Sequence, residues 1–120
     1  MIACALGKGG ISALKSEGDG ITPIGRFRPL AVLFRGDRVR APGGDLPMRA
    51  IRQNDGWADD PGSALYNRHV RLPFAPSHEI LMRDDHLYDV VVITDHNQRP
   101  RVRGRGSSVF LHCSREGLTP

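Results

Sequence analysis

The chain has 120 residues, of which 39% are hydrophobic and 25% are charged, and its formal net charge is +4 at pH 7. A chain of this length forms one domain at most, and this balance of apolar and charged residues excludes disorder throughout. The count of 14 glycines and 9 prolines is high for the length, which favours a mainly β fold of short strands joined by turns.

The composition also argues against several classes of protein. No stretch of about 18 apolar residues is present, so the sequence predicts no membrane span, and residues 1–10 lack the pattern of a signal peptide. Cys4 and Cys113 are the only cysteines and form no CxxC pair, so neither a zinc site nor a disulfide framework is predicted. The arginines are scattered and aromatic residues make up only 6%, which disfavours binding to nucleic acid.

The first half of the chain predicts short strands separated by loops. Residues 2–6 are an apolar run that predicts a strand, whereas Lys15 to Phe27 are polar and rich in glycine and predict a loop. Arg28 to Arg35 have apolar residues bounded by charge and predict a buried strand. Met48 to Gln53 predict another strand, and Asn54-Asp55-Gly56 predicts a tight turn after it.

The second half contains the clearest strand signal. Ser63 to Asp85 show no sustained period, so we expect a long ordered loop with one helical turn near His78 to Arg83. Tyr88 to Thr94 contain three valines and an isoleucine in succession and predict a buried strand. A turn begins at Asp95-His96-Asn97, and Ser107 to His112 predict the returning strand of a β-hairpin.

The five histidines fall into two groups. His69, His78, His86 and His96 lie in loop-like or turn-like surroundings without a second ligand at fixed spacing, and we interpret them as surface or loop-bracing residues. His112 differs because it ends a predicted buried strand, where a titratable group is placed to face a cleft. From the residues alone, a structural role for His112 is an equal alternative.

The two cysteines are interpreted as structural. Cys113 directly follows His112, and adjacent residues on a strand point to opposite faces, so the two side chains are not expected to meet. Cys113 is therefore interpreted as a buried bystander thiol. Cys4 lies in an apolar run and is interpreted as a small packed residue.

A basic row precedes the last predicted strand, and it consists of Arg99, Arg101, Arg103 and Arg105. In an extended segment these alternating side chains would project from one face. Such a row could hold an anionic ligand such as a carboxylate or a phosphate. The alternative is a solvated hairpin edge that charge protects from aggregation.

Two blocks of sequence are specific enough to indicate a family. The first is Gly18-Asp19-Gly20 followed by Thr22-Pro23-Ile24-Gly25-Arg26-Phe27, and the second is Gly106-Ser107-Ser108-Val109-Phe110-Leu111-His112. Shorter segments accompany them at 4–11, 55–57, 66–67, 83–89 and 95–97. In this order the segments resemble a subgroup of L,D-transpeptidases (YkuD-type), and the resemblance covers nearly the whole chain.

The resemblance implies a single domain over residues 1–120 with an L,D-transpeptidase-like β-sandwich or barrel, long loops and little helix. Such domains link peptidoglycan stem peptides in the bacterial cell wall through a cysteine acyl-enzyme, with no metal and no organic cofactor. A histidine on the strand before the active-site loop activates the thiol, which needs a base at neutral pH. His112 matches that histidine, and Arg105, Gly106 and Ser107 are expected to line the substrate cleft. The family also implies a place in the periplasm or cell envelope.

The chain departs from the family pattern in one respect. The family nucleophile lies in a Gly-Cys segment shortly after the histidine strand, whereas the sequence ends at Leu118-Thr119-Pro120 without one. Cys113 lacks the preceding glycine and does not fill this position. We therefore expect a C-terminally incomplete domain that is inactive as given. The alternative is a non-catalytic peptidoglycan-binding or remnant domain, and the oligomeric state is left open.

Overall fold

A computed structural model describes residues 1–118, which form nine short strands and one 3₁₀ helix. The strands are β1 (Ile11–Ser12), β2 (Thr22–Pro23), β3 (Pro29–Phe34), β4 (Met48–Ala50), β5 (Asp55–Ala58), β6 (His69–Arg71), β7 (His78–Ile80), β8 (Val90–Thr94) and β9 (Phe110–His112), and η1 (Glu116–Leu118) follows. The fold is mainly β, as the composition and the resemblance predict. No helix within residues 1–118 is long and apolar enough to span a membrane.

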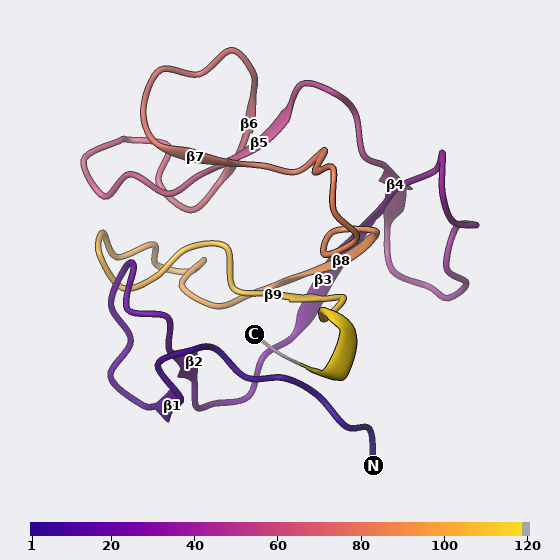
Figure 1. Cartoon of the computed structure of the whole chain (residues 1–120). Helices are drawn as coiled ribbons and strands as arrows, with labels where there is room; N and C mark the ends of the chain where they lie inside the picture. The colour runs from indigo at the N-terminus through magenta and orange to yellow at the C-terminus, as the bar shows by residue number, and fades with distance from the viewer. Residues whose placement is uncertain (119–120) are drawn as a thin grey trace.

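The larger sheet has four strands in the order β4-β3-β8-β9 (Figure 1). β3 pairs in parallel with β4 and antiparallel with β8, and β9 pairs antiparallel with β8. The strands predicted at Arg28–Arg35 and Tyr88–Thr94 are confirmed as β3 and β8. The predicted hairpin is also confirmed, because β8 and β9 are joined in register from Ile93 opposite Phe110 to Val91 opposite His112.

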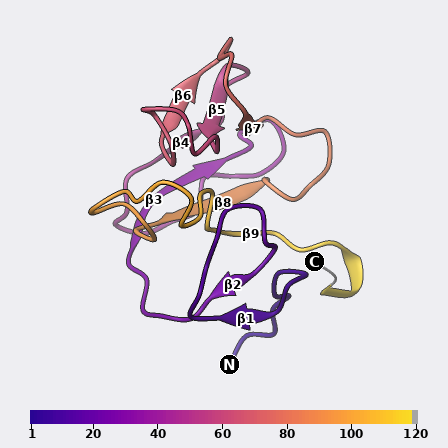
Figure 2. The ribbon, with the colours of Figure 1, turned by 90° about the vertical axis from the view of Figure 1, so that its left-hand side faces the viewer.

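The smaller sheet has three antiparallel strands in the order β6-β5-β7. In both views it forms a layer above β3 and β8, while the small pair of β1 and β2 lies on their other side (Figures 1 and 2). The prediction of a loop with a helical turn over Ser63–Asp85 is therefore wrong, because β6 and β7 both lie within it. Each of these strands has three residues, which is too short to show a period, and each is stabilised by backbone pairing to β5.

The predicted tight turn at Asn54-Asp55-Gly56 is also wrong, because β5 already begins at Asp55. The turn lies one residue earlier and is closed by a 3.1 Å hydrogen bond from Asp55 N to Arg52 O. Gly56 serves close packing instead, since a Cβ atom there would stand 2.7 Å from Leu72 Cδ2. All four residues of β5 are buried, so turn-forming residue types are used here at the centre of a sheet.

The strand predicted at residues 2–6 is absent, and the first strand is β1. The first hydrogen bond to a neighbouring segment is that of Gly7 N–H to Thr22 Oγ1 at 2.7 Å, and backbone-to-backbone pairing follows at Gly9, whose N–H donates to Gly20 O at 2.8 Å. β1 then pairs in parallel with β2. β2 lies inside the segment Lys15 to Phe27, which was predicted as a loop. Without a partner for its backbone, the preceding run forms no ladder. Cys4 is exposed, which corrects its interpretation as a packed residue.

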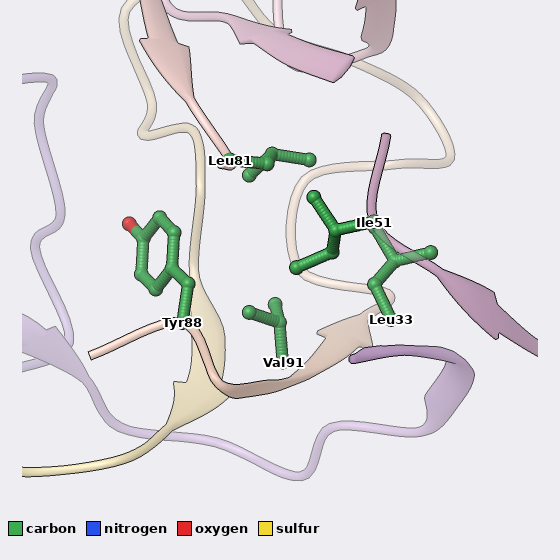
Figure 3. Packing of buried hydrophobic residues seen from close by; sticks show 5 residues of the cluster. All are labelled: Leu33, Ile51, Leu81, Tyr88 and Val91. Carbon is green, nitrogen blue, oxygen red and sulfur yellow. The ribbon is translucent and has the colours of Figure 1, made fainter. Parts of the chain in front are cut away.

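The core lies between the two sheets and consists of Leu33, Ile51, Leu81, Tyr88 and Val91, whose side chains point toward one another (Figure 3). Leu81 and Val91 are fully buried. Phe110 of β9 packs against this cluster and meets the Trp57 ring of β5 edge-on at 5.1 Å. The last strand is therefore fixed to both sheets, which determines the face on which its remaining residues lie.

Candidate functional site

His112 lies at the open edge of the larger sheet. It is the last residue of β9, which pairs only with β8 within residues 1–118. Because His112 stands opposite Val91, the two side chains share the face that carries the core, and Leu111 points to the other face with 64% of its surface exposed. His112 itself is exposed. The fold thus presents an imidazole at the exposed edge of the larger sheet, on the face that carries the core.

A backbone carbonyl fixes the state of the His112 ring. Nδ1 lies 2.8 Å from Cys113 O, and a carbonyl oxygen only accepts, so Nδ1 carries the proton in this hydrogen bond. In the neutral ring Nε2 then has the free lone pair. No hydrogen bond in the described part of the chain occupies Nε2. The basic nitrogen is therefore open to a thiol or a substrate.

Tyr88 supports the His112 ring from the core side. The two rings meet edge-on with centroids 5.3 Å apart, and the Arg83 guanidinium lies over the Tyr88 ring, 5.3 Å from its centroid. Burial, followed by the nearby Glu79 carboxylate, raises the pKa of Tyr88 above its ordinary value. The phenol remains neutral and donates to Glu79 Oε2 at 3.2 Å. It orients the imidazole without competing for a proton.

An open groove of about 700 Å³ lies beside Tyr88, whose hydroxyl donates to the lining residue Glu79. Its lining is mostly charged and consists of Asp59, His78, Glu79, Ile80, Met82, Arg83, Asp84 and Asp85. Asp59 Oδ1 is buried there and has no hydrogen-bond partner among residues 1–118. Hydrogen bonds from Arg83 hold the pKa of Asp85 at about 2. The lining is therefore mainly acidic, because the Arg83 guanidinium is paired with Asp85.

The predicted substrate-binding residues Arg105, Gly106 and Ser107 lie before β9, at the opposite end of the strand from His112. The Gly106 N–H donates to the Tyr66 hydroxyl at 3.0 Å, and the Ser107 hydroxyl donates to Glu17 Oε1 at 2.5 Å. Within residues 1–118, no hydrogen bond or ring contact joins any of the three to His112. Gly106 and Ser107 thus have their polar groups engaged within the protein, and direct contact with a substrate stays a prediction.

Tyr66 and Glu17 hold this segment in place. The Tyr66 hydroxyl donates to Glu17 Oε1 at 2.7 Å, and Tyr66 is only 3% exposed. Burial and then the Glu17 carboxylate raise the pKa of Tyr66 to about 12. The sequence predicted Glu17 to lie in a loop and gave it no role, although it directly precedes the first of the two specific blocks.

Asn67 is a second structural residue that the sequence reasoning missed. It is 2% exposed, and its Oδ1 accepts from Trp57 Nε1 at 3.0 Å. Its Nδ2 donates to the carbonyls of His96 and Asn97 at 3.2 and 2.9 Å. Asn67 has a φ of 57°, a conformation that asparagine adopts more readily than most residues. The Tyr66-Asn67 pair had appeared only as a short part of the resemblance.

The remaining histidines each have a single nearby polar partner. The partners are Asp55 for His69 at 2.6 Å, Pro76 O for His78 at 2.8 Å, Asp89 for His86 at 2.8 Å, and Arg105 O for His96 at 3.2 Å. His69 and His78 lie in β6 and β7 and not in the predicted loops, and all four rings contact neighbouring groups of the protein. Within residues 1–118, no group of three or more His, Cys, Asp or Glu side chains is arranged to hold a metal ion.

Cys113 is half-buried rather than buried. Its backbone N–H donates to Leu87 O at 3.0 Å, which continues the alignment of the chain beyond β9. In the described part of the chain no hydrogen bond joins its thiol to His112, whose ring instead contacts the Cys113 carbonyl. The geometry gives the pair no nucleophile-base contact.

Comparison with known families decides the identity of the fold. The profile of the L,D-transpeptidase catalytic domain (YkuD) matches residues 1–117. The chain belongs to the L,D-transpeptidase family. No curated protein and no solved structure matches it.

The L,D-transpeptidase match gives the exposed histidine its chemical context. The resemblance assigned the role of base to His112, and its open Nε2 is the geometry that such a role requires. The second block of the L,D-transpeptidase pattern, 106–112, contains both the segment held by Tyr66 and the histidine. One function of that block is therefore structural, since it fixes the start of the strand that ends in His112.

We expect Tyr66→Phe to destabilise this L,D-transpeptidase domain by about 1–3 kcal/mol, because the buried Gly106 N–H loses its acceptor. Urea unfolding at neutral pH measures the effect. Tyr88→Phe is the matched control, since it removes the same atom from a weaker 3.2 Å bond and should cost about 1 kcal/mol or less. Equal effects of the two substitutions would contradict the role of Tyr66.

Proposed function

We propose that this domain serves acyl transfer between peptidoglycan stem peptides, with a cysteine acyl-enzyme and His112 as the general base. The observation that carries the proposal is the state of the imidazole, whose Nδ1 is held by the Cys113 carbonyl while Nε2 stays open. A thiol near its ordinary pKa is mostly protonated at neutral pH and requires such a base. The family match supports the reaction class.

The proposed reaction has two steps. His112 Nε2 accepts the proton of the thiol, and the thiolate attacks a carbonyl of the donor peptide. The thioester forms as the donor's C-N bond breaks, and the imidazolium returns the proton to the leaving amine. An acceptor amine then attacks the thioester, His112 takes its proton, and the cysteine is released. This scheme uses no metal and no organic cofactor.

The groove supports peptide binding, because its lining residue Glu79 accepts the hydrogen bond of Tyr88, whose ring contacts His112. Its acidic side chains suit an amino group, whereas the Arg83 guanidinium is already paired with Asp85. We propose that it receives part of a stem peptide, and that residues 1–120 act as a single domain in the cell envelope. Arg105, Gly106 and Ser107 remain proposed as cleft-lining residues at the other end of β9.

Neither cysteine in the chain has the position that the reaction needs. Cys4 is exposed within the segment before β1, and the Cys113 thiol makes no contact with His112 in residues 1–118. Neither follows a glycine, as the family pattern requires. We propose that the 120-residue chain as given binds its substrate without transpeptidase activity, so peptidoglycan binding without catalysis is the second candidate function.

The 120-residue chain is therefore expected to form no cross-linked product from donor and acceptor stem peptides, as measured by mass spectrometry. The physical reason is that no hydrogen bond joins a cysteine thiol to His112 within residues 1–118, as direct proton transfer requires. Cys113→Ala and Cys4→Ala are the controls, and both should behave like the unchanged chain. Product that disappears on Cys113→Ala would identify Cys113 as a nucleophile and contradict the proposal.

A further inference from the structure

Two arginines of one loop, Arg99 and Arg101, lie close to Arg68, which is distant from them in sequence, beside Asn67. The Nε–H group of Arg101 donates to Asn67 O at 3.2 Å, and this carbonyl belongs to the peptide group that leads directly into Arg68. Arg99 lies two residues before Arg101 on the same loop. The three residues, Arg68, Arg99 and Arg101, are here called the arginine cluster.

The prediction that the arginines of residues 99–105 project from one face of an extended segment is wrong. Turns occupy 99–100 and 103–104, and Gly104 has a φ of 84°, so the segment is not extended. The Asn97 side chain stabilises this folded loop. Its Oδ1 accepts from Val102 N at 2.8 Å, and its Nδ2 donates to Val102 O at 2.9 Å. The loop thereby closes on itself and carries Arg99 and Arg101 toward Arg68.

The cluster is held in place by buried backbone. The Asn67 carbonyl accepts from both Arg101 Nε and Gln98 Nε2, at 3.2 and 3.1 Å, and Arg101 also donates to Gln98 Oε1. Asn67 itself is 2% exposed. Arg101 is therefore positioned before any ligand arrives, which reduces the conformational entropy lost on binding.

The positive charges of the cluster are not compensated within the protein. In the part of the chain that the structure describes, no carboxylate forms an ion pair with any member. Burial and the neighbouring charges of Arg68 and Arg99 lower the pKa of Arg101, as expected where like charges are held close. Other arginines of this fold do have acidic partners, and these are Arg35, Arg38, Arg49 and Arg83. An anion bound at the cluster would relieve the repulsion.

We propose that the arginine cluster is a docking site for the carboxylates of the peptidoglycan polymer. The choice of peptidoglycan as the polymer rests on the proposed function. The choice of a carboxylate as the anion rests on the arginine cluster, because a guanidinium group binds a carboxylate through two parallel hydrogen bonds. No aromatic ring stacks on a cluster member within residues 1–118, so a platform for nucleobases is absent there. The loop of the cluster leads to the start of β9, at the opposite end from His112. The site therefore holds the polymer and takes no part in the chemistry.

Co-sedimentation of the 120-residue chain with purified insoluble peptidoglycan tests the proposal. Arg68→Gln with Arg99→Gln is expected to weaken binding by about tenfold, while Arg101 is kept because of its bonds to Asn67. The matched control is Arg26→Gln with Arg40→Gln, which removes the same charge from exposed positions without side-chain partners in the described residues and should leave binding nearly unchanged. Thermal unfolding shows that both variants remain folded. Amidation of the polymer carboxylates should reproduce the loss in the unchanged protein.

Three results would overturn the proposal: no binding to peptidoglycan, equal weakening in both double variants, or binding that survives amidation. Tighter binding to a single-stranded nucleic acid, lost in the Arg68 and Arg99 variant, would assign the cluster to that polymer instead. Binding requires no cysteine, so a failure of the acyl-transfer scheme would leave the sedimentation result unchanged. The two proposals therefore fail separately.

Discussion

His112→Ala is expected to lower the rate of acylation by about two to four orders of magnitude in a protein that joins this domain to the family's Gly-Cys segment. The reason is that Nε2 is the open basic nitrogen at the sheet edge. In that protein, Nε2 should lie about 3 to 4 Å from the thiol, because proton transfer requires direct contact or one bridging water. Single-turnover labelling of the cysteine with a donor peptide measures the rate.

The fold should survive this substitution, since His112 is exposed and lies at the end of an edge strand. Leu111→Ala is the matched control, because its side chain is on the opposite face of β9 and is 64% exposed. It should leave the acylation rate within a few fold of the original. A fall of less than tenfold for His112→Ala, with normal thermal stability, would reduce His112 to a structural residue.

The elements that the sequence predicts well are those whose signal is local. β3 and β8 have consecutive apolar or β-branched residues over 29–34 and 90–94, and such runs indicate buried strands without reference to the rest of the chain. β6 and β7 carry no such signal. They form because β5 offers backbone groups on both sides, and that pairing is decided by the tertiary fold.

The same distinction separates the parts of the candidate site. His112 was identified from its place at a strand end and from the family pattern, both of which are read along the chain. The contacts of Tyr66 with Glu17 and of Asn67 with Arg101 join residues 49 and 34 positions apart, and no local pattern predicts them. Arg105, Gly106 and Ser107 were predicted to line the substrate cleft; they lie at the opposite end of β9 from His112, and their contact with a substrate stays a prediction.

Asp55 was predicted to lie in a turn, but the structure buries it at the start of β5. Its carboxylate is 2% exposed and accepts two hydrogen bonds from Arg49 at 2.8 Å, one from Arg52 N at 2.7 Å, and a contact with His69 Nε2 at 2.6 Å. Burial raises the pKa of this carboxyl, but the hydrogen bonds from Arg49, Arg52 and His69 outweigh it and hold the pKa well below 3.8. The carboxylate thus ties β4, β5 and β6 together.

Asp55→Ala is expected to destabilise the fold by about 3 kcal/mol at pH 7, because it removes one partner of a buried ion pair. Arg49 is 34% exposed and can be hydrated in the variant, which keeps the loss at the lower end for such pairs. Thermal unfolding should show a melting temperature lower by roughly 10 °C or more. Asp85→Ala, which breaks a pair whose carboxylate is 43% exposed, should cost less than about 1 kcal/mol.

The pH dependence separates this ion pair from a simple packing effect. The pKa of Asp55 is lower in the folded chain than its ordinary 3.8, so the unfolded chain takes up the proton first as the pH falls. The stability from Asp55 is therefore fully present well above pH 4 and is lost progressively as the pH falls through 4 toward the lower folded pKa. The stability difference between the unchanged chain and Asp55→Ala should accordingly narrow between about pH 5 and pH 2, when urea unfolding is followed at each pH. A difference that stays constant over this range would mean that Asp55 stabilises the fold by its shape and not by its charge.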